Sequence, residues 1–380
     1  MRILFFCEQY FPNISGGAEI FVQLLAEELV KVGHIVYVCS IADAYKQGEK
    51  NGVNLIYLKY HNIYWQYKKQ GNLLSKTIWH LVDMYNLFYR KDITKILKDV
   101  SPDIVHTNNI CGFSSVIWTI AKQNQIPIIH TIHDYYLMCY RTTMFHNNRV
   151  CEKQCLSCRF GSIFAKHESH KVDAVVGVSN YILNKHVEKG YFRNAIIKKA
   201  IGNGFIVNRH SKIKRENCVI GFMGSVTPVK GVERLVSDFC RLGKEGWRLK
   251  IAGKGNDDYI SYLKGRYNNK NIEFVGRVDP DEFLSSISLL VVPSLWNEPF
   301  GRVVVEAIYN SCPVIVSKRG GIPEIVNDSH FVFDPDDPDS LFHLLNEFIQ
   351  GQLAWEPLIM DKQNTLESVL ESYLHIYRIL

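Results

Sequence analysis

Short apolar runs alternate along the chain with longer segments in which apolar residues recur every three or four positions. The short runs are typical of buried strands, and the longer segments are typical of amphipathic helices. In the first half of the chain, strands are predicted at RILFFC, HIVYVCS, VNLIYLKY, DIVHTN, PIIHTIHD and DAVVGVS. A second series is predicted at CVIGFMG, RLKIAG, IEFVG, LLVVPS, PVIVSK and HFVFD. This alternation of strands and helices indicates parallel sheets covered by helices.

The two series of strands predict two domains. A stretch rich in Lys, Asn and Ile, at residues 198–215, separates them. We therefore expect an α/β protein with two doubly wound, Rossmann-like domains, at residues 1–198 and 205–360, that face a central cleft. Residues 361–380 have helical spacing and are expected to pack back on the first domain or on the second. Ligands of such sheets bind beyond the carboxyl ends of the strands, so the loops that follow strands should carry the site.

Composition narrows the choice of partners. The chain has 380 residues, of which 47% are hydrophobic and 22% charged, and its net charge is +6. Its Lys and Arg residues are scattered, which favours an anionic small ligand or a membrane surface over nucleic acid. No run approaches the roughly 20 apolar residues that span a bilayer, and the first run is too short for a signal peptide. We expect a cytoplasmic protein, at most peripheral on the inner face of the cytoplasmic membrane.

The densest group of candidate site residues lies in the segment 289–326, LLVVPSLWNEPFGRVVVEAIYNSCPVIVSKRGGIPEIV. Pro299 and Gly301 stand where a helix should begin, so Glu298 lies at its start and Glu306 on its second turn. Two such carboxylates can accept hydrogen bonds from the hydroxyls of one ligand, and the free amides of the first turn can donate to hydroxyls or phosphate. The alternative is a pair of solvated acids on an amphipathic helix, which the whole block disfavours.

A second candidate is the segment GFMGSVTPVKGVERL. Its strand ends at Gly224 and its helix begins after Gly231, which leaves Lys230 beside the helix N-terminus. A lysine next to unsatisfied amides suits a diphosphate, although a solvated surface lysine is an equally simple interpretation.

A third candidate is the pair Gly16-Gly17, between the first strand and a long amphipathic helix. A glycine-rich first turn suits phosphate, and a plain tight turn is the alternative. The segment lacks the GxGxxG spacing of dinucleotide-binding folds, so a hydride-transfer cofactor is poorly supported.

Together these residues resemble the large glycosyltransferase family 4, whose retaining enzymes have two Rossmann-like domains in the arrangement called GT-B. The resemblance covers almost the whole chain, and its most specific element is the paired-glutamate motif Glu298-PFGRVVV-Glu306. It implies that Glu298 contacts the hydroxyls of the donor sugar and that Glu306 holds the nucleotide ribose. It also implies that the amides of Phe300 and Gly301 flank the sugar. The donor-binding residues that it implies are Gly16, Gly17, Gly224, Lys230, Glu298, Pro299, Phe300, Gly301, Arg302 and Glu306.

The same resemblance implies how the diphosphate is held. Lys230 resembles the lysine that neutralises it, and Gly16-Gly17 resembles the loop that closes on it. Many relatives carry Gly-Arg-Leu at the end of this strand, whereas this chain has Gly-Ser-Val at residues 224–226. We therefore hypothesise that Arg302 or Arg319 assists Lys230.

His133, in the sequence Thr-Ile-His-Asp, resembles the active-site histidine of the family, near the reactive face of the sugar. With Glu298 and Lys230 it completes the implied catalytic set. His106 also ends a predicted strand, where a packed histidine is at least as plausible. Retaining enzymes of this kind are thought to use front-face displacement without a divalent metal. The acidic residues Asp257-Asp258 and Asp334–Asp339 are interpreted as loop acids and not as an Asp-x-Asp metal motif. No cofactor is expected to be required for catalysis.

Four cysteines stand close together in the sequence CYRTTMFHNNRVCEKQCLSC, at Cys139, Cys151, Cys155 and Cys158. The close Cys155-x-x-Cys158 pair with two further thiols fits a structural zinc, although the other gaps are not those of a standard zinc finger. Reduced thiols or disulfides are the alternatives. Because this segment directly follows His133, we expect it to form part of the wall of the acceptor site.

A mixture of aromatic and basic residues marks the segment 57–90, including residues 65–70. Aromatic faces stack on sugars, and amphipathic basic stretches bind anionic lipid surfaces. A lipid-linked saccharide acceptor would use both, whereas a helical hairpin that covers the sheet would use neither.

The function that these features favour is a hexosyltransferase type of reaction, which retains the anomeric configuration and requires no metal. A sugar would pass from a UDP- or GDP-sugar to a saccharide or lipid-linked saccharide. Such a reaction belongs to the synthesis of bacterial surface polysaccharide, for example lipopolysaccharide O-antigen, capsule or exopolysaccharide. The alternatives are a nucleotide-sugar epimerase or phosphorylase of the same fold and a non-catalytic sugar-nucleotide-binding protein.

Overall fold

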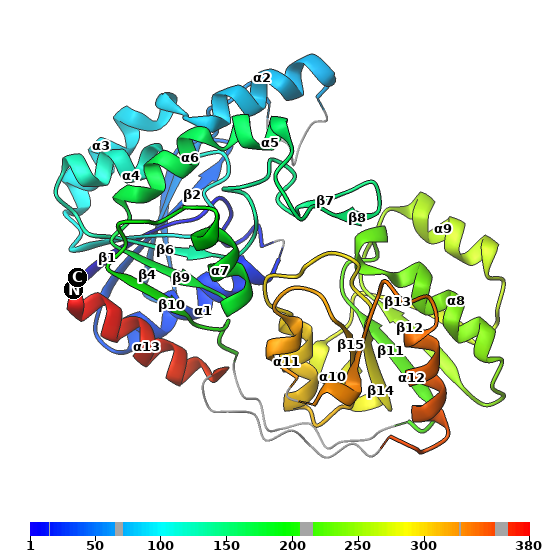
Figure 1. Ribbon diagram of the computed structural model, residues 1–380. Coiled ribbons are helices and arrows are strands. Elements are labelled where there is room, and N and C mark those ends of the chain that lie inside the picture. Colours follow the sequence, from blue (N-terminus) through cyan, green and yellow to red (C-terminus); the bar gives the residue numbers. More distant parts are fainter. Residues whose placement is uncertain (15, 65–70, 206–215, 327, 354–363) are drawn as a thin grey trace. The chain divides into compact units, whose positions relative to one another are not determined.

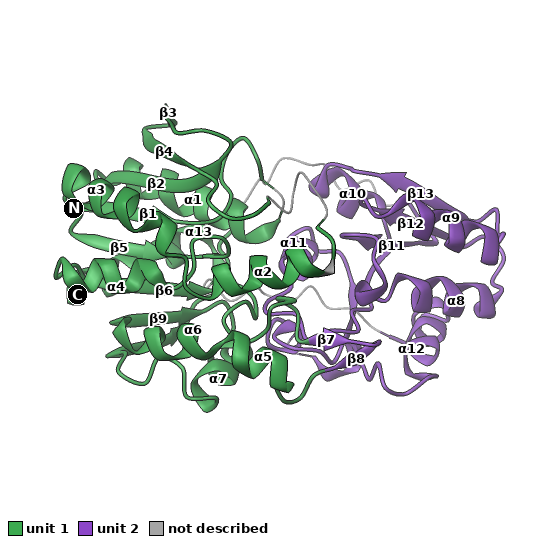
Figure 2. Ribbon diagram, turned by 90° about the horizontal axis from the view of Figure 1, so that it is seen from above, with its two compact units in different colours: residues 1–144, 151–205, 362–380 green, residues 145–150, 206–361 purple. Residues whose placement is uncertain are grey.

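The computed structural model describes residues 1–14, 16–64, 71–205, 216–326, 328–353 and 364–380. The chain divides into two compact units (Figure 2). The first comprises residues 1–144, 151–205 and 362–380, and the second comprises residues 145–150 and 206–361. The aromatic and basic residues of the segment 65–70 lie outside the described residues.

The first unit is built on an eight-stranded sheet in the order β10-β9-β6-β5-β1-β2-β4-β3. Every pairing is parallel except that of β3 with β4, which is antiparallel. The chain runs outward from β1 in one direction and then returns to β5 on its other side, so a topological switch point lies between β1 and β5. The strands are β1 (Arg2–Phe6), β2 (Ile35–Ala42), β3 (Lys46–Lys50), β4 (Val53–Lys59), β5 (Ile104–Thr107), β6 (Ile128–Ile132), β9 (Ala174–Gly177) and β10 (Ile197–Ala200).

Helices cover this sheet, with α1 and α13 side by side (Figure 1). The helices of the unit are α1 (Gly17–Lys31), α2 (Leu73–Met84), α3 (Arg90–Val100), α4 (Val116–Gln123), α5 (Leu156–Gly161), α6 (Ile163–Glu168), α7 (Asn180–Glu188) and α13 (Leu366–Ile379). Strand β1 is buried along most of its length, as expected for a central strand of a parallel sheet.

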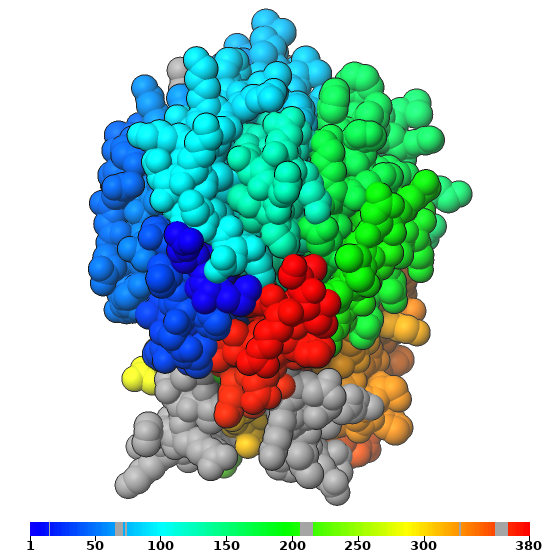
Figure 3. Space-filling model, turned by 90° about the vertical axis from the view of Figure 1, so that its left-hand side faces the viewer, coloured from blue at the N-terminus to red at the C-terminus, as the bar shows by residue number. Residues whose placement is uncertain are grey.

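Helix α13 packs on the first unit beside the N-terminal segment, where it is drawn in red (Figure 3). Its residues Val369, Tyr373 and Tyr377 are buried in the core of that unit. The hydroxyl of Tyr377 lies 2.7 Å from Nδ1 of His106, and that of Tyr373 lies 3.0 Å from the hydroxyl of Thr131. His106 is therefore a packed core histidine.

The second unit has a six-stranded sheet in the order β13-β12-β11-β14-β15-β16, with all pairings parallel. Its switch point lies between β11 and β14. The strands are β11 (Val219–Met223), β12 (Arg248–Ala252), β13 (Ile272–Gly276), β14 (Leu289–Val292), β15 (Val314–Ser317) and β16 (Val332–Phe333). The helices are α8 (Val232–Leu242), α9 (Asp257–Arg266), α10 (Pro280–Ser286), α11 (Arg302–Tyr309) and α12 (Ser340–Ile349). Residues 145–150 carry a short hairpin, β7 (Phe145–His146) and β8 (Arg149–Val150).

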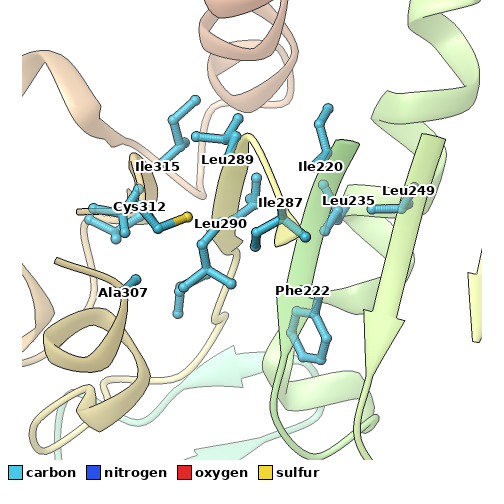
Figure 4. Packing of buried hydrophobic residues seen from close by; sticks show 14 of the residues in the cluster. Ile220, Phe222, Leu235, Leu249, Ile287, Leu289, Leu290, Ala307, Cys312 and Ile315 are labelled. Carbon is cyan, nitrogen blue, oxygen red and sulfur yellow. The ribbon is translucent and has the colours of Figure 1, made fainter. Parts of the chain in front are cut away.

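Aliphatic side chains from both faces of this sheet form the core of the second unit (Figure 4). Leu235 of α8 and Ala307 of α11 are fully buried, and Leu290 lies on the central strand β14. The apolar stripe of each helix packs on the sheet, and the loops after β11 and β14 place the N-termini of α8 and α11 beyond the carboxyl ends of these strands.

The predicted α/β architecture with two doubly wound sheets is confirmed, and each of the twelve predicted strands is present. The first unit continues beyond residue 198 to Phe205, because β10 pairs with β9 and Phe205 bridges to Thr365. Strands β3 and β10 and the β7–β8 hairpin were not predicted.

Candidate functional site

In the second unit, the loop that follows β14 lies against the start of α8. Gly231 has a φ of +70°, and a Cβ at this position would lie 1.9 Å from the carbonyl oxygen of Pro293. The amide of Leu295 donates to the carbonyl oxygen of Val229 at 2.9 Å. Because no side chain larger than hydrogen fits there, Gly231 allows the two loops at the switch point to meet.

This close approach brings Lys230 to Glu298, 68 residues apart in sequence. Nζ of Lys230 donates to Oε1 of Glu298 at 2.8 Å, and the hydroxyl of Ser294 donates to the same oxygen. Both charged side chains are largely buried, with 23% of the lysine and 11% of the glutamate exposed. A carboxylate and an ammonium group thus stand together at the switch point, where ligands of doubly wound sheets bind.

The backbone on the other side of Glu298 is held by Gly320 and Gly321. The amide of Gly321 donates to the carbonyl oxygen of Glu298 at 2.7 Å. Gly320 has a φ of +63°, and a Cβ there would lie 2.1 Å from that same carbonyl oxygen. The loop that carries Glu298 is therefore positioned by close backbone contact, which confines the carboxylate to one place.

Helix α11 begins directly after this loop, with Gly301 at its N-cap and no side chain that caps it. Its first amides therefore have no partner within the helix and can donate to a ligand. Arg302 is the first residue of the helix, and its Nε donates to Oε1 of Glu306, one turn further along, at 2.7 Å. Burial raises the pKa of Glu306, although the Arg302 guanidinium opposes this rise.

Two other predicted residues border this site. Gly224 ends β11 with a φ of +153°, and its carbonyl oxygen would lie 1.7 Å from a Cβ on Gly253, at the end of β12. Arg319 donates through Nε to the carbonyl oxygen of Leu295 at 3.2 Å and pairs with Asp336. Arg302 and Arg319 each pair with an acidic side chain, as Lys230 does, and the assistance of Lys230 by one of them stays a prediction.

His133 follows β6 in the first unit. Its Nε2 lies 2.9 Å from Oδ1 of Asn108, at the end of β5. Its Nδ1 is buried and has no hydrogen-bond partner among the described residues. Burial lowers the pKa of His133 to about 3, so the ring is neutral at physiological pH. A neutral imidazole with one free nitrogen can exchange a hydrogen bond with a ligand hydroxyl.

Gly16 and Gly17 start α1, with Gly16 as the N-cap in an extended conformation. The acidic side chain of Glu19 lies in the first turn and accepts from Asn109. His133, Gly16 and Gly17 thus belong to the first unit, whereas the two glutamates and Lys230 belong to the second.

The first unit also contains a cavity of about 820 Å³. Its wall includes Trp79 and Lys76 from α2, Asp134 and Tyr136 from the loop after β6, and Tyr140. The residues Cys139, Cys158, Phe160 and Ser162 also line it. Aromatic rings, carboxyl groups and a base in one concave space suit a polar, hydroxylated ligand.

Asp83 is the most deeply buried carboxyl group of this cavity. It accepts from the amide of Gly112 at 2.7 Å and from the hydroxyl of Tyr136 at 2.7 Å. Burial nevertheless raises its pKa from 3.8 to about 7. Between these values the native state binds more protons than the unfolded state, so stability from this group is lost as the pH rises through this window.

The variant Asp83→Asn should therefore stabilise the protein at pH 8 and have much less effect at pH 5. At about 1.36 kcal/mol per pKa unit, the gain at pH 8 is at most roughly 4 kcal/mol. Thermal unfolding of both proteins at the two pH values measures it. An equal shift of the melting temperature at pH 5 and pH 8 would contradict the assignment of a raised pKa.

The four cysteines of the insert all lie in the first unit, and none of the four is part of a disulfide. Sγ of Cys139 and Sγ of Cys158 are 3.8 Å apart. Within the described ranges, no three His, Cys, Asp or Glu side chains are grouped closely enough to hold a metal ion as they stand. Two of the four thiols therefore meet, and the predicted zinc site remains a prediction.

Sequence analysis did not single out Ser294 or Asn108. Ser294 contacts Glu298, and Asn108 contacts His133. Each is the last residue of a predicted strand, LLVVPS or DIVHTN, and that position at the carboxyl end of a strand is the signal that could have identified them. In the part of the chain that the structure describes, no helix has the length and apolar character needed to cross a bilayer.

Comparisons with known proteins agree with this geometry. A model described as Glycosyltransferase Family 4 matches residues 15–197, and one described as Glycosyl transferases group 1 matches residues 206–364. A 42.6 kDa protein in the cps region of Klebsiella pneumoniae is 37% identical over 351 residues, which are 90% of this chain and 92% of that protein. The alpha-monoglucosyldiacylglycerol synthase of Streptococcus pneumoniae is 22% identical over 355 residues, which are 87% and 74% of the two chains.

Solved structures resemble the whole chain. The Anabaena protein HepE in complex with UDP has a TM-score of 0.75 and 17% identity, with full coverage of both chains. Sucrose-phosphate synthase from Thermosynechococcus elongatus has a TM-score of 0.73 and 16% identity, and covers 100% of this chain and 98% of its own. These likenesses show a common fold.

Proposed function

Because the chain belongs to glycosyltransferase family 4 and has the GT-B fold, we propose that it transfers a sugar from a nucleoside diphosphate sugar with retention of configuration. The acceptor is a saccharide or lipid-linked saccharide in surface polysaccharide assembly. The relative from a cps region supports this pathway.

The observation that carries the proposal is the contact between Lys230 and Glu298 at the switch point of the second unit. Without ligand, the two charges neutralise each other. A donor offers a hydroxylated sugar to the carboxylate and a diphosphate to the ammonium group, so both halves of the pair gain a partner of suitable charge. A ligand that offers only one of these groups would leave either the carboxylate or the ammonium group without a suitable partner.

The donor proposed is a UDP-sugar, with a GDP-sugar as the alternative. Support comes from HepE, which was solved with UDP and with UDP-glucose. In this proposal Glu298 binds hydroxyls of the sugar and Glu306 binds the ribose, while the first amides of α11 flank the sugar. Burial raises the pKa of Glu306, and a bound ribose would cover the part of this side chain that is still exposed.

In the proposed reaction, the bond between the anomeric carbon and the diphosphate oxygen breaks as the acceptor oxygen bonds to the same face. The acceptor proton passes to the leaving diphosphate. Lys230 and the N-termini of α8 and α11 stabilise the negative charge that develops on the diphosphate, in place of a divalent metal. His133, neutral at physiological pH, orients a hydroxyl of the transferred sugar.

We assign the acceptor to the cavity of the first unit. Tyr140 and Trp79 provide aromatic faces for a sugar ring, and Asp134 provides an acceptor for its hydroxyls. Part of the cysteine segment lines the same wall, through Cys139 and Cys158.

Exposed apolar side chains beside this cavity support a lipid-linked acceptor and contact with a membrane surface. Helix α2 packs against α5 and α6, where the views in Figures 1 and 2 also place it. The exposed residues, which we call the apolar ridge, are Leu74, Ile78 and Leu81 on α2, Leu156 and Phe160 on α5, and Ile163 and Phe164 on α6. Exposed Lys76 and Arg159 stand on the same helices and would attract anionic headgroups.

Replacing Leu156 and Phe160 with serine should reduce binding to anionic phospholipid vesicles by at least about tenfold, because each buried apolar side chain contributes about 1.5–3 kcal/mol. Co-sedimentation with vesicles measures this. Ile196→Ser is the matched control, since Ile196 is 78% exposed, like Leu156 at 82%, but lies outside the ridge. An equal loss of vesicle binding in the Ile196→Ser control would exclude the apolar ridge as a membrane contact. Unchanged vesicle binding in the double variant would exclude it as well.

A thermal-shift screen of nucleotide sugars followed by a transfer assay tests the proposed function. A donor at 100 times its dissociation constant stabilises the native state by about 2.7 kcal/mol. The expected result is one stabilising donor that is consumed only when a saccharide acceptor is present. Turnover of the donor without an acceptor would favour an epimerase, and binding without any turnover would favour a non-catalytic protein.

A further inference from the structure

We infer that Cys139, Cys151, Cys155 and Cys158 form a structural tetrathiolate site for a zinc ion, which anchors one wall of the cavity in the first unit. This inference concerns the folding of the chain and stands apart from the proposed reaction. It rests on the spacing of two sulfur atoms, on the backbone amides around three of them, and on the position of the fourth.

The first observation is the distance of 3.8 Å between Sγ of Cys139 and Sγ of Cys158. In a tetrahedral site with zinc–sulfur bonds of about 2.3 Å, neighbouring sulfur atoms lie about 3.8 Å apart. A disulfide would require about 2.05 Å. The two thiols therefore already have the separation of two ligands of one tetrahedral metal ion.

The second observation is the backbone around the sulfur atoms. The amides of Ser157 and Cys158 both hydrogen-bond to Sγ of Cys155, the first cysteine of the Cys-x-x-Cys turn. The amides of Arg141 and Met144 do the same for Cys139. Such N–H···S contacts spread the negative charge of a thiolate, and hydrogen bonds from outside the ligand shell commonly orient metal ligands.

Cys158 completes this pattern, since its Sγ accepts from the amide of Tyr140. Thiolates rather than thiols are the form that binds zinc, and a buried thiolate needs a positive partner.

The third observation concerns the two remaining ligands. Cys155 is exposed and is the N-cap of α5, and Cys151 is half-exposed just after β8. Three or more donors do not yet converge in the described residues, so metal binding must turn the side chains of Cys151 and Cys155 inward. A change of rotamer at an exposed side chain costs little.

The consequence of such a site would be local. Helix α5 has only six residues, too few to be stable by itself, and its residues Cys158 and Phe160 line the cavity. A metal ion that ties α5 to the loop after β6 would replace the apolar core that this short helix lacks. Free Cys240 of the second unit, which accepts from Asn269, lies outside this arrangement.

Metal analysis of the full chain, purified under reducing conditions without a metal-binding tag, tests the inference. We expect about one zinc ion per chain. Serine variants of each of the four cysteines should lose most of this metal, whereas Cys240→Ser should keep it. Undiminished zinc in all four variants would overturn the assignment.

Cobalt titration of the metal-free wild-type protein gives a second measurement that needs no variant. Tetrahedral thiolate coordination should produce sulfur-to-cobalt charge transfer and intense visible absorption at one equivalent, and zinc should displace it. Hydrogen exchange over residues 139–161 should slow on zinc addition. Absence of this cobalt spectrum, with a disulfide between Cys139 and Cys158 in non-reducing peptide mapping, would replace the metal site by a redox pair.

Discussion

Lys230→Ala should lower kcat/KM for the donor by about 10²–10³-fold, because it removes the cation proposed to stabilise charge on the leaving diphosphate. Arg302 pairs with Glu306 and Arg319 pairs with Asp336, and we do not expect either guanidinium to take the place of Lys230. The same variant should bind free nucleoside diphosphate more weakly. Steady-state kinetics and calorimetry of diphosphate binding measure both effects.

The control for this variant is Lys244→Ala, which removes an exposed lysine in the turn after α8. It should leave both quantities unchanged. Loss of Lys230 also leaves Glu298 with Ser294 as its remaining partner, so a stability loss of about 1–3 kcal/mol is expected. Unchanged diphosphate affinity in a folded Lys230→Ala protein would show that the phosphates are held elsewhere.

Glu298→Gln should reduce kcat for transfer by about 10–10²-fold while leaving the affinity for free nucleoside diphosphate equal or higher. The glutamine cannot offer a charged acceptor to the sugar hydroxyls, and a hydrogen bond to a charged group contributes about 1.5–3 kcal/mol. In the ligand-free protein Glu298 neutralises Lys230 at 2.8 Å. Its neutral replacement therefore frees the ammonium group for the diphosphate.

Lys230→Ala should weaken diphosphate binding and Glu298→Gln should not, and this difference separates a phosphate-binding role from a sugar-binding role. Glu273→Gln, an exposed carboxylate on β13, is the matched control and should behave as wild type. If Glu298→Gln weakened diphosphate binding as much as Lys230→Ala, the division of roles between the two residues would be wrong.

The regular elements were predictable because buried parallel strands carry continuous apolar runs. Strand β3 was missed because its sequence, KQGEK, has no apolar residue and its side chains are mostly exposed. Such a strand forms through backbone pairing with β4, and its charges are typical of a sheet edge. Strand β10, IKKA, is a short edge strand of the same kind.

Contacts between residues that are far apart in the chain could not be predicted from the sequence. It located Lys230 and Glu298 beside two helix starts, but their contact depends on the adjacency of β11 and β14, which no local pattern encodes. Gly231 then allows the approach to Pro293. The packing of α13 was also undetermined, because its apolar face alone does not reveal that Tyr377 meets His106.

Product analysis by NMR, after incubation of the full chain with the donor found by the screen and a saccharide acceptor, tests the central claim most directly. The account predicts release of nucleoside diphosphate in step with a new glycosidic bond whose anomeric configuration equals that of the donor. An inverted anomeric configuration, or a consumed donor with no glycosidic product, would contradict it.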